Sequence, residues 1–211
     1  MSDTPHPRFA RVYPGVAARA DRRGAADHRR RLLEGLAGRV VEVGAGNGRN
    51  FAHYPPTVTE VLAIEPEPTL RALAAEAARE AAVPITVLTG LADALPFGDG
   101  ELDAAVVSLV LCSVPGPASA LSELRRVLRA GGELHFYEHV IPLHQPKRAL
   151  FKAADRSGIW PAVAAGCHLS RDTAAAITAA GFAIEQCERI AFRSAPLEPR
   201  LPYILGRARL P

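Results

Sequence analysis

A run of valines leads directly into three alternating glycines early in the chain. The segment VVEVGAGNGRN, residues 40–50, places Gly44, Gly46 and Gly48 after a predicted buried strand that carries Glu42. Glycine permits tight turns and leaves backbone N–H groups open to a ligand. The segment therefore predicts a loop that a ligand approaches closely.

The spacing of the loop argues against a dinucleotide. A dinucleotide fingerprint reads GxGxxG, whereas this loop reads GxGxG and has Arg49 at the sixth position. The carboxylate of Glu42, two residues before the first glycine, would repel a pyrophosphate. It suits a ligand with an ammonium and a sulfonium group, such as S-adenosylmethionine.

Four motifs, in order along the chain, resemble those of the class I S-adenosylmethionine-dependent methyltransferases. The glycine loop is the first, and Glu65 ends the second predicted strand, 21 residues after Gly44. The others are GLADALPFGDGELD (90–103) and LRRVLRAGGEL (124–134). The resemblance is close over residues 36–140 and looser over 170–209. It implies that Glu65 binds the two ribose hydroxyls and that Asp93 meets the adenine amino group.

The loop and the resemblance together predict the cofactor-binding residues. Most lie at strand ends, and one lies in the N-terminal segment, which can fold over the cofactor. They are Tyr13, Glu42, Gly44, Ala45, Gly46, Gly48, Asn50, Glu65, Pro66, Ala92, Asp93 and Leu109. Structural roles are the alternatives: Glu42 could bond loop amides, Asp93 could form a turn, and Asn50 could support the loop.

Four further segments resemble the animal alkyl-thiol methyltransferases of the methyltransferase-11 family. They are NFAHYPP (50–56), LVLCSVP (109–115), YEHV (137–140) and GCHLSRD (166–172). Quinone and phospholipid methyltransferases are more distant in pattern. The animal proteins carry a membrane-anchoring N-terminus, whereas MSDTPHPRFARVYPG has no apolar signal segment. We therefore expect a cytoplasmic protein without stable membrane insertion.

Methyl transfer from a sulfonium mainly requires alignment of donor and acceptor. In this fold, acceptors bind beyond the carboxyl ends of the fourth and fifth strands, here LVLCSVP and YEHV. Their apolar character favours a small lipophilic acceptor, with a thiol first and oxygen or nitrogen next. His139 and then His168 are the candidate catalytic bases, with structural roles as alternatives. No base is obligatory, since a thiol with a pKa near ~8.5 is already partly ionised at neutral pH.

Alternating apolar and helical patterns predict an α/β fold. It is a doubly wound, seven-stranded, mostly parallel sheet of the Rossmann-like methyltransferase type, with a terminal antiparallel strand pair. Strands are predicted at 39–43, 61–64, 85–88, 102–111, 133–140, 182–192 and 203–209. Helices are predicted at 68–82, 117–129, 147–156 and 171–180, with Gly131–Gly132 ending the second and Ser170 capping the last.

Two segments fall outside this alternation. Residues 1–35 are predicted to be a helical N-terminal lid, and 36–211 the methyltransferase domain. Within that domain, residues 141–169 form an insertion on the acceptor side, with Trp160 as a candidate wall of the pocket.

Composition limits the other functions. The net charge is +3, but residues 1–39 hold nine arginines against four acids. Nucleic-acid binding is not expected, because arginine and alanine are enriched throughout the chain. The three cysteines show no CxxC or Cys/His ligand spacing, so no metal site is expected. The alternatives are a dinucleotide-binding oxidoreductase, a non-catalytic cofactor-binding partner protein and an RNA methyltransferase. The sequence leaves the oligomeric state open.

Overall fold

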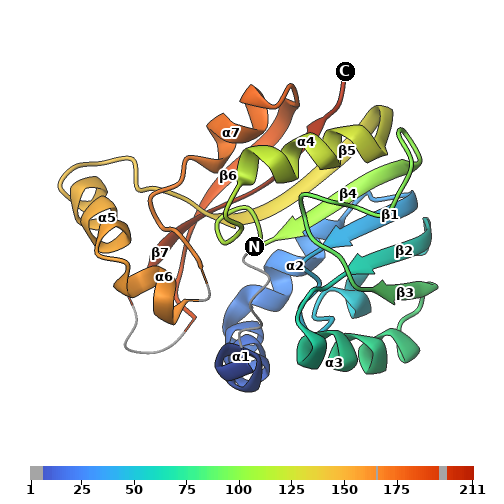
Figure 1. Cartoon of the computed structure of the whole chain (residues 1–211), viewed down its shortest axis with the longest axis horizontal. Helices are drawn as coiled ribbons and strands as arrows, with labels where there is room; N and C mark the ends of the chain where they lie inside the picture. The colour runs from blue at the N-terminus through green and yellow to red at the C-terminus, as the bar shows by residue number, and fades with distance from the viewer. Residues whose placement is uncertain (1–6, 165, 195–198) are drawn as a thin grey trace.

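A seven-stranded sheet forms the centre of the molecule (Figure 1). The computed structural model describes residues 7–164, 166–194 and 199–211. The strand order is β3-β2-β1-β4-β5-β7-β6. Strands β1 to β5 pair in parallel, and β7 runs antiparallel to both β5 and β6. The prediction of a mostly parallel seven-stranded sheet with a terminal antiparallel pair is confirmed. The strands are β1 (Gly38–Val43), β2 (Val58–Ile64), β3 (Ile85–Leu88), β4 (Leu102–Ser108), β5 (Leu128–His139), β6 (Ala183–Phe192) and β7 (Leu201–Arg209).

Helices cover both faces of the sheet, which explains why its central strands are apolar throughout. Neighbouring side chains of a strand point to opposite faces. Val40 accordingly packs in the core cluster that contains Leu32, whereas Val41 packs in the cluster that contains Leu121. Helices α2 (Ala26–Leu33) and α3 (Pro68–Arg79) contribute to the first cluster, and α4 (Pro117–Val127) and α7 (Thr173–Ala179) to the second.

The glycine loop lies where the strand order reverses. Strand β1 is flanked by β2 on one side and β4 on the other. Their connections leave in opposite directions, and such a point opens a crevice beyond the carboxyl ends of the strands. The sheet topology therefore places the predicted cofactor residues around one crevice.

The N-terminal segment is helical over the residues that the structure describes. Helix α1 (Pro7–Ala20) is followed by the π-helical turn η1 (Asp21–Ala25) and then by α2. Gly24, with φ 120°, marks a kink inside η1. Residues 7–33 thus agree with the predicted helices, while the lid role of residues 1–35 stays a prediction.

The 141–169 insertion contains two helices, α5 (Lys147–Arg156) and α6 (Ile159–Val163). Helix α5 was predicted at these residues. Asp155 at its end accepts hydrogen bonds from the backbone N–H groups of Leu169 (3.0 Å) and Ser170 (2.7 Å). This carboxylate fixes the chain that returns from the insertion to the sheet.

Two predicted boundaries are wrong. Helix α4 ends at Val127, and β5 begins at Leu128, so Gly131 lies inside the strand with φ 74° rather than at a helix end. Asp172 caps α7 by accepting from the Ala175 N–H (3.2 Å), because the Ser170 backbone is bonded to Asp155 instead. Among the described residues, no helix has the length and apolar character needed to cross a membrane.

Candidate active site

The three glycines of the loop all have left-handed backbone conformations. Their φ angles are 69° at Gly44, 59° at Gly46 and 75° at Gly48. A Cβ at Gly44 would lie 2.5 Å from Val110 Cγ2, and a Cβ at Gly48 would lie 2.8 Å from the Cβ of Ala77. Both positions therefore require glycine for conformation and for packing. The glycine loop thereby lies directly against Val110, in the turn that follows β4.

Glu65 joins the end of β2 to the glycine loop. Its carboxylate accepts hydrogen bonds from the backbone N–H groups of Gly46 (2.7 Å) and Glu67 (2.9 Å). The side chain is buried, and burial raises the pKa of its carboxyl above the ordinary range. Its two oxygens thereby join the end of β2 to the glycine loop and to Glu67, the residue that precedes α3. Pro66, beside it, is half-buried, and its carbonyl oxygen accepts from Arg71 (2.9 Å).

Glu42 is enclosed by side chains that support the loop. Its carboxylate accepts from Asn50 Nδ2 (2.8 Å) and from the Tyr54 hydroxyl (2.7 Å). Arg29 in turn donates to Asn50 Oδ1 (3.0 Å) and pairs with Asp21 (3.0 Å). Burial raises the pKa of Glu42 to about 7. This geometry supports the structural alternative for Asn50 and gives Glu42 a bracing role, because both of its oxygens are bonded to side chains.

The loop after β3 presents one buried and one exposed candidate. Ala92 is buried, whereas Asp93 is exposed in a short turn closed by the Leu91–Ala94 bridge. Glu123 holds this turn by accepting from the Leu95 N–H (2.9 Å). Asp93 therefore stands free of the core at the end of β3.

Glu138 holds the turn after β4 in place. This fully buried carboxylate accepts from the backbone N–H groups of Val110 (2.8 Å), Leu111 (3.0 Å) and Cys112 (3.0 Å). Leu109 precedes them with φ 62°, the one non-glycine residue with positive φ in the described part of the chain. Such backbone strain persists where surrounding contacts fix it, and it is concentrated at functional sites.

Comparisons with known proteins agree with this arrangement. The family described as "Methyltransferase domain" matches residues 41–136. The human thiol S-methyltransferase TMT1B is 34% identical over 183 residues, which cover 83% of this chain and 73% of that protein. The chain belongs to the S-adenosylmethionine-dependent methyltransferases.

Solved structures with low identity share the fold. A methyltransferase of Thermotoga maritima superposes with a TM-score of 0.69 at 21% identity, and the match covers 96% of each chain. A geranyl diphosphate methyltransferase solved in complex with S-adenosylmethionine superposes with a TM-score of 0.67 at 14% identity, covering 88% of this chain and 84% of that one. The family assignment favours methyl transfer over the dinucleotide-dependent alternative.

The crevice of this methyltransferase fits a nucleoside-bearing cofactor. Its glycine loop lies beside the end of β2, where the Gly46 N–H donates to the Glu65 carboxylate. Two buried side-chain oxygens, Asn47 Oδ1 and Ser108 Oγ, have no hydrogen-bond partner among the described residues. Both belong to the segments at the carboxyl ends of β1 and β4, where polar ligand groups would provide partners. When bound, S-adenosylmethionine supplies an electrophilic methyl group at this edge of the sheet.

Tyr13 lies against the glycine loop from the N-terminal side. A Cβ at Gly46 would meet Tyr13 Cε1 at 3.1 Å. Arg49 Nη2 also donates to the Pro14 carbonyl oxygen (3.2 Å), so the loop and α1 are joined by hydrogen bonding. Burial raises the pKa of the Tyr13 phenol, which therefore stays neutral. The predicted position of Tyr13 beside the cofactor loop agrees with these contacts.

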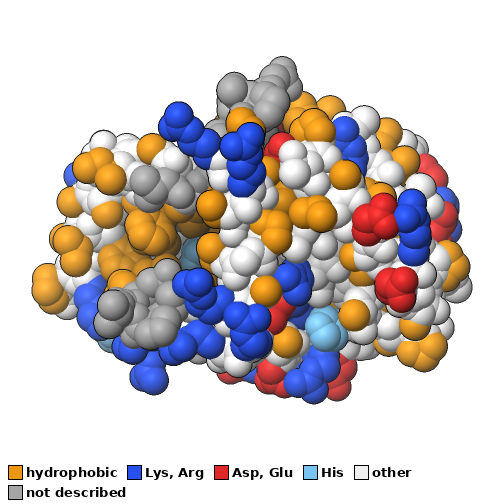
Figure 2. All heavy atoms as spheres, turned by 90° about the horizontal axis from the view of Figure 1, so that it is seen from below, with side chains coloured by type: hydrophobic (Ala, Val, Ile, Leu, Met, Phe, Trp, Pro, Cys, Tyr) orange, Lys and Arg blue, Asp and Glu red, His pale blue; other side chains and the backbone are white. Residues whose placement is uncertain are grey.

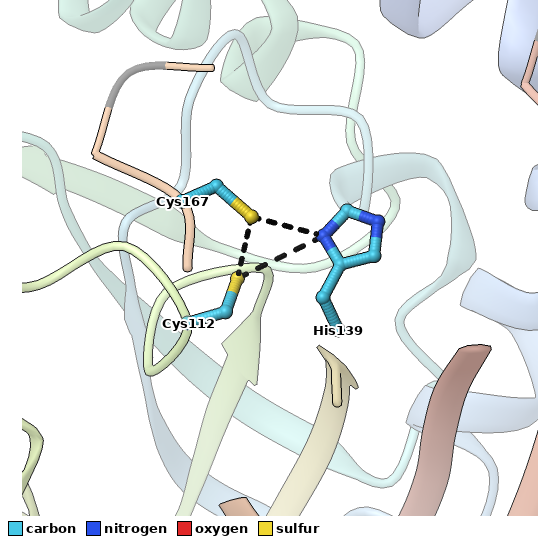
Figure 3. Close-up of side chains that lie close together, drawn as sticks. All are labelled: Cys112, His139 and Cys167. Atoms are coloured by element: carbon cyan, nitrogen blue, oxygen red, sulfur yellow. Dashed lines mark hydrogen bonds between the residues drawn. The ribbon is translucent and has the colours of Figure 1, made fainter. Parts of the chain in front are cut away.

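Three side chains meet beyond the carboxyl ends of β4 and β5 (Figure 3). Cys112 follows β4, His139 ends β5, and Cys167 lies after α6. The two sulfur atoms are 3.7 Å apart, and His139 Nδ1 is 3.2 Å from Cys167 Sγ and 4.0 Å from Cys112 Sγ. His139 Nε2 is buried without a partner among the described residues. His139 thus turns Nδ1 toward the two thiols.

The two cysteines of this cluster are unequal. Their mutual hydrogen bond, and then the contact with His139, lowers the pKa of Cys167, while the same bond and burial raise the pKa of Cys112. The two thiols therefore titrate as a coupled pair.

The second candidate base lies outside this cluster. His168 is part exposed, and its Nδ1 is 3.8 Å from Asp155 Oδ2. Its backbone N–H donates to the Cys112 carbonyl oxygen (2.7 Å). The structure thus brings His139, but not the His168 ring, to the two thiols.

Sequence reasoning missed the Cys112–His139–Cys167 cluster and the role of Glu138. Spacing rules search for ligands close together in the chain, whereas these residues come from three segments that the sheet brings together. A signal was present in the sequence: both cysteines and His139 lie in the segments LVLCSVP, YEHV and GCHLSRD. The structure brings one side chain from each of these three segments together.

Proposed function

We propose that this methyltransferase transfers a methyl group from S-adenosylmethionine to the sulfur of a small apolar thiol. The observation that carries the proposal is the apolar character of the acceptor end. Leu109, Phe151 and Trp160 are partly buried there against the core cluster that contains Cys112 and Cys167. The neighbouring Glu138 carboxylate is already bonded to three backbone amides. The name of the human relative, a thiol S-methyltransferase, supports the same acceptor class.

The reaction requires little of the protein beyond alignment. The acceptor sulfur gains a methyl group and loses its proton, and the leaving group is a neutral thioether, so no oxidant or reductant is involved. A thiol with an ordinary pKa of about 8.5 is partly ionised at neutral pH. Holding the two reactants in line can therefore supply most of the rate, on the order of 7–11 kcal/mol of the barrier in well-oriented systems.

On the donor side, we assign Glu65 to the ribose hydroxyls and Asp93 to the adenine amino group. Glu65 lies next to the glycine loop, where its carboxylate accepts from the Gly46 N–H, and the exposure of Asp93 leaves its carboxylate free to meet a ligand. The backbone around Ala45 and Gly46 would face the amino-acid part. Glu42 would act on this part through the loop that it braces, and Asn50 would do the same.

The N-terminal segment and the 141–169 insertion would enclose the reactants. Figure 2 shows a hollow with hydrophobic side chains on the face that carries these segments, and Lys and Arg side chains gather beside it. A cavity of about 330 Å³ lies at the end of β6, lined by Arg23, Ala191, Phe192, Arg193 and Arg200. Three of these five residues are arginines, so this cavity is basic and only Ala191 and Phe192 contribute an apolar wall.

The test is an assay of methyl-donor consumption with alkyl thiols, phenols, amines, quinols and RNA as acceptors. We expect the highest kcat/KM with alkyl thiols and a rise with alkyl chain length. Turnover confined to amines, quinols or phenols would reject the sulfur acceptor. Methylation of RNA that weakens steeply with salt would show a phosphate-driven nucleic-acid enzyme instead.

A matched pair of variants tests the acceptor wall. Trp160→Ala should raise KM for long-chain thiols about tenfold and change KM for the shortest thiol little, because it removes apolar contact area. Leu150→Ala is the control, since Leu150 lies on α5 with 66% of its surface exposed. Equal effects of the two substitutions on every thiol would place the acceptor elsewhere.

A further inference from the structure

The distances within the Cys112–His139–Cys167 cluster match those of a tetrahedral metal site. Zinc binds sulfur at ~2.3 Å and imidazole nitrogen at ~2.0–2.1 Å, so tetrahedral angles place two sulfur ligands ~3.8 Å apart and a sulfur and a nitrogen ~3.6 Å apart. The observed Sγ–Sγ distance is 3.7 Å, and the two Sγ–Nδ1 distances, 3.2 and 4.0 Å, lie on either side of the second value (Figure 3). All three donor atoms thus lie close enough to one another to contact a single ion.

Contacts of the neighbouring backbone hold the segments that carry the two cysteines. Glu138 accepts from the Cys112 N–H, and the Cys112 carbonyl accepts from the His168 N–H. Cys167 follows Gly166, whose missing side chain allows close packing, because a Cβ there would lie 2.8 Å from the Ser113 carbonyl oxygen. The cluster is therefore a consequence of how the insertion docks on the β4 turn, and is not an accident of three flexible side chains.

The donor set indicates a particular metal chemistry. Two thiolates and one imidazole suit zinc, and three protein ligands leave the fourth tetrahedral position to water or substrate, as in catalytic zinc sites. A simple disulfide would use the two cysteines but would give the third donor no role. Here His139 Nδ1 lies within reach of both sulfur atoms, and the apolar side chains of Leu109 and Trp160 pack on the same core cluster.

We propose that Cys112, His139 and Cys167 bind one zinc ion and that the acceptor thiol takes the fourth ligand position as a thiolate. The zinc site itself is independent of the proposed function, whereas the identity of the fourth ligand rests on it. The two cysteine thiols release their protons to solvent when the metal binds, and the acceptor thiol does so when it coordinates. No oxidation state changes.

This assignment changes the role predicted for His139. Coordination through Nδ1 leaves the hydrogen on Nε2, so His139 would be a metal ligand and not a proton acceptor. The metal would stabilise the acceptor thiolate, which makes a separate base unnecessary. This proposal is the opposite of the expectation of no metal site, which was drawn from residue spacing alone. Measurement of zinc binding decides between them.

The experiment measures zinc binding to the full chain, kept reduced with a phosphine. Competition with a chromogenic chelator should give one zinc per chain. Cys112→Ser, Cys167→Ser and His139→Asn should each lower the affinity more than about 100-fold, since each removes a metal ligand. Cys187→Ser is the matched control, because this third cysteine lies exposed on β6. The control should bind zinc as the unmodified chain does.

Two measurements on the unmodified chain avoid any dependence on the folding of the variants. Zinc should slow alkylation of Cys112 and Cys167, mapped by mass spectrometry, and leave Cys187 unchanged. Cobalt in place of zinc should give the strong visible absorption of a tetrahedral thiolate site, and a short alkyl thiol should shift that spectrum.

The outcomes separate the two proposals. Absence of zinc binding, or equal protection of all three cysteines, would overturn the metal site even if thiols are methylated. A cobalt spectrum that no alkyl thiol changes would overturn the fourth-ligand assignment. Zinc binding by a protein that methylates no thiol would support the metal site and reject the proposed acceptor.

Discussion

At Glu65, cofactor binding and loop stability depend on the same carboxylate. Glu65→Ala should weaken the binding of S-adenosylmethionine more than tenfold, because charge-assisted hydrogen bonds to hydroxyls are each worth roughly 1.5–3 kcal/mol. It should also lower the free energy of unfolding by about 1–3 kcal/mol, since the buried N–H of Gly46 loses its acceptor. Titration calorimetry and urea unfolding measure the two effects.

The neighbouring acid provides the control for this prediction. Glu67 caps α3 by accepting from the Leu70 N–H (2.7 Å). Glu67→Gln keeps an acceptor oxygen for this cap and should leave cofactor affinity within about twofold. An unchanged affinity in Glu65→Ala would remove Glu65 from the ribose site and leave it a structural brace.

Glu42 makes the stability of the chain depend on pH. Burial raises its pKa from 4.5 to about 7 in the folded state. Between these values the folded chain keeps a proton that the unfolded chain has lost, so stability falls as pH rises through this window. The free energy of unfolding should fall by about 3 kcal/mol across this window, because each pKa unit corresponds to ~1.4 kcal/mol.

Glu42→Gln provides the comparison, because glutamine has the same shape and does not titrate. The free energy of unfolding of wild type minus that of the variant should fall by about 3 kcal/mol between pH 4.5 and pH 7.5. Urea unfolding at half-unit steps of pH would measure this difference. A difference that stays constant across the range would show that Glu42 titrates normally despite its burial.

At the scale of elements, local patterns predicted the parallel strands well. Strands covered on both faces need continuous apolar residues, so β1 to β4 are visible as short runs. The start of β5 was missed because its pairing of Leu128 with Leu102 is a tertiary contact that continues past Gly131. The cap of α7 was missed because Ser170 and Asp172 are both good capping residues, and the choice depends on Asp155.

The candidate site shows the same division between local and long-range information. The glycine loop and Glu65 were found because a strand and the turn after it are adjacent in sequence. The Asp21–Arg29–Asn50–Glu42 network and the Cys112–His139–Cys167 cluster join segments that no spacing rule connects. They become visible once the sheet order is known.

A buried arginine is one of the contacts that join the N-terminal helices to the loop after β1. Arg29 is 6% exposed and bonds both Asp21 and Asn50. Arg29→Ala should lower the free energy of unfolding by about 3–5 kcal/mol, because Asp21 loses its positively charged partner and Asn50 loses a hydrogen-bond donor. Arg30→Ala, one residue along, should cost less than about 1 kcal/mol, since its pair with Asp27 is exposed. Similar losses in the two variants, measured by urea unfolding, would contradict the anchoring role.

At the scale of the whole molecule, four of the nine arginines in residues 1–39 form ion pairs within the described part of the chain. Arg29 pairs with Asp21, Arg31 with Glu188 on β6, and Arg39 with Glu60 and Glu101. These pairs join the segment to the body of the protein. Part of the positive charge near the N-terminus therefore has a structural role.

These contacts determine where the N-terminal segment can be cut. Helix α1 buries little besides Ala10 and Ala17, whereas α2 buries Leu32 and Leu33, and the Leu32 carbonyl oxygen lies 2.6 Å from His135 Nδ1. A deletion of residues 1–20 keeps the Asp21–Arg29 pair, but a deletion of 1–28 removes Asp21 and leaves the Arg29 guanidinium without its carboxylate.

Deletion of residues 1–20 should therefore leave a folded protein with a melting temperature lowered by only a few degrees. It should weaken the binding of S-adenosylmethionine about tenfold, because Tyr13 no longer covers the loop at Gly46. Deletion of 1–28 should cost about 3–5 kcal/mol more stability, since a buried charge loses its partner. Calorimetry of cofactor binding and thermal unfolding compare the two forms. Unchanged cofactor affinity in the shorter deletion would reject the lid, and equal stability of both deletions would show that the Asp21–Arg29 pair does not anchor the segment.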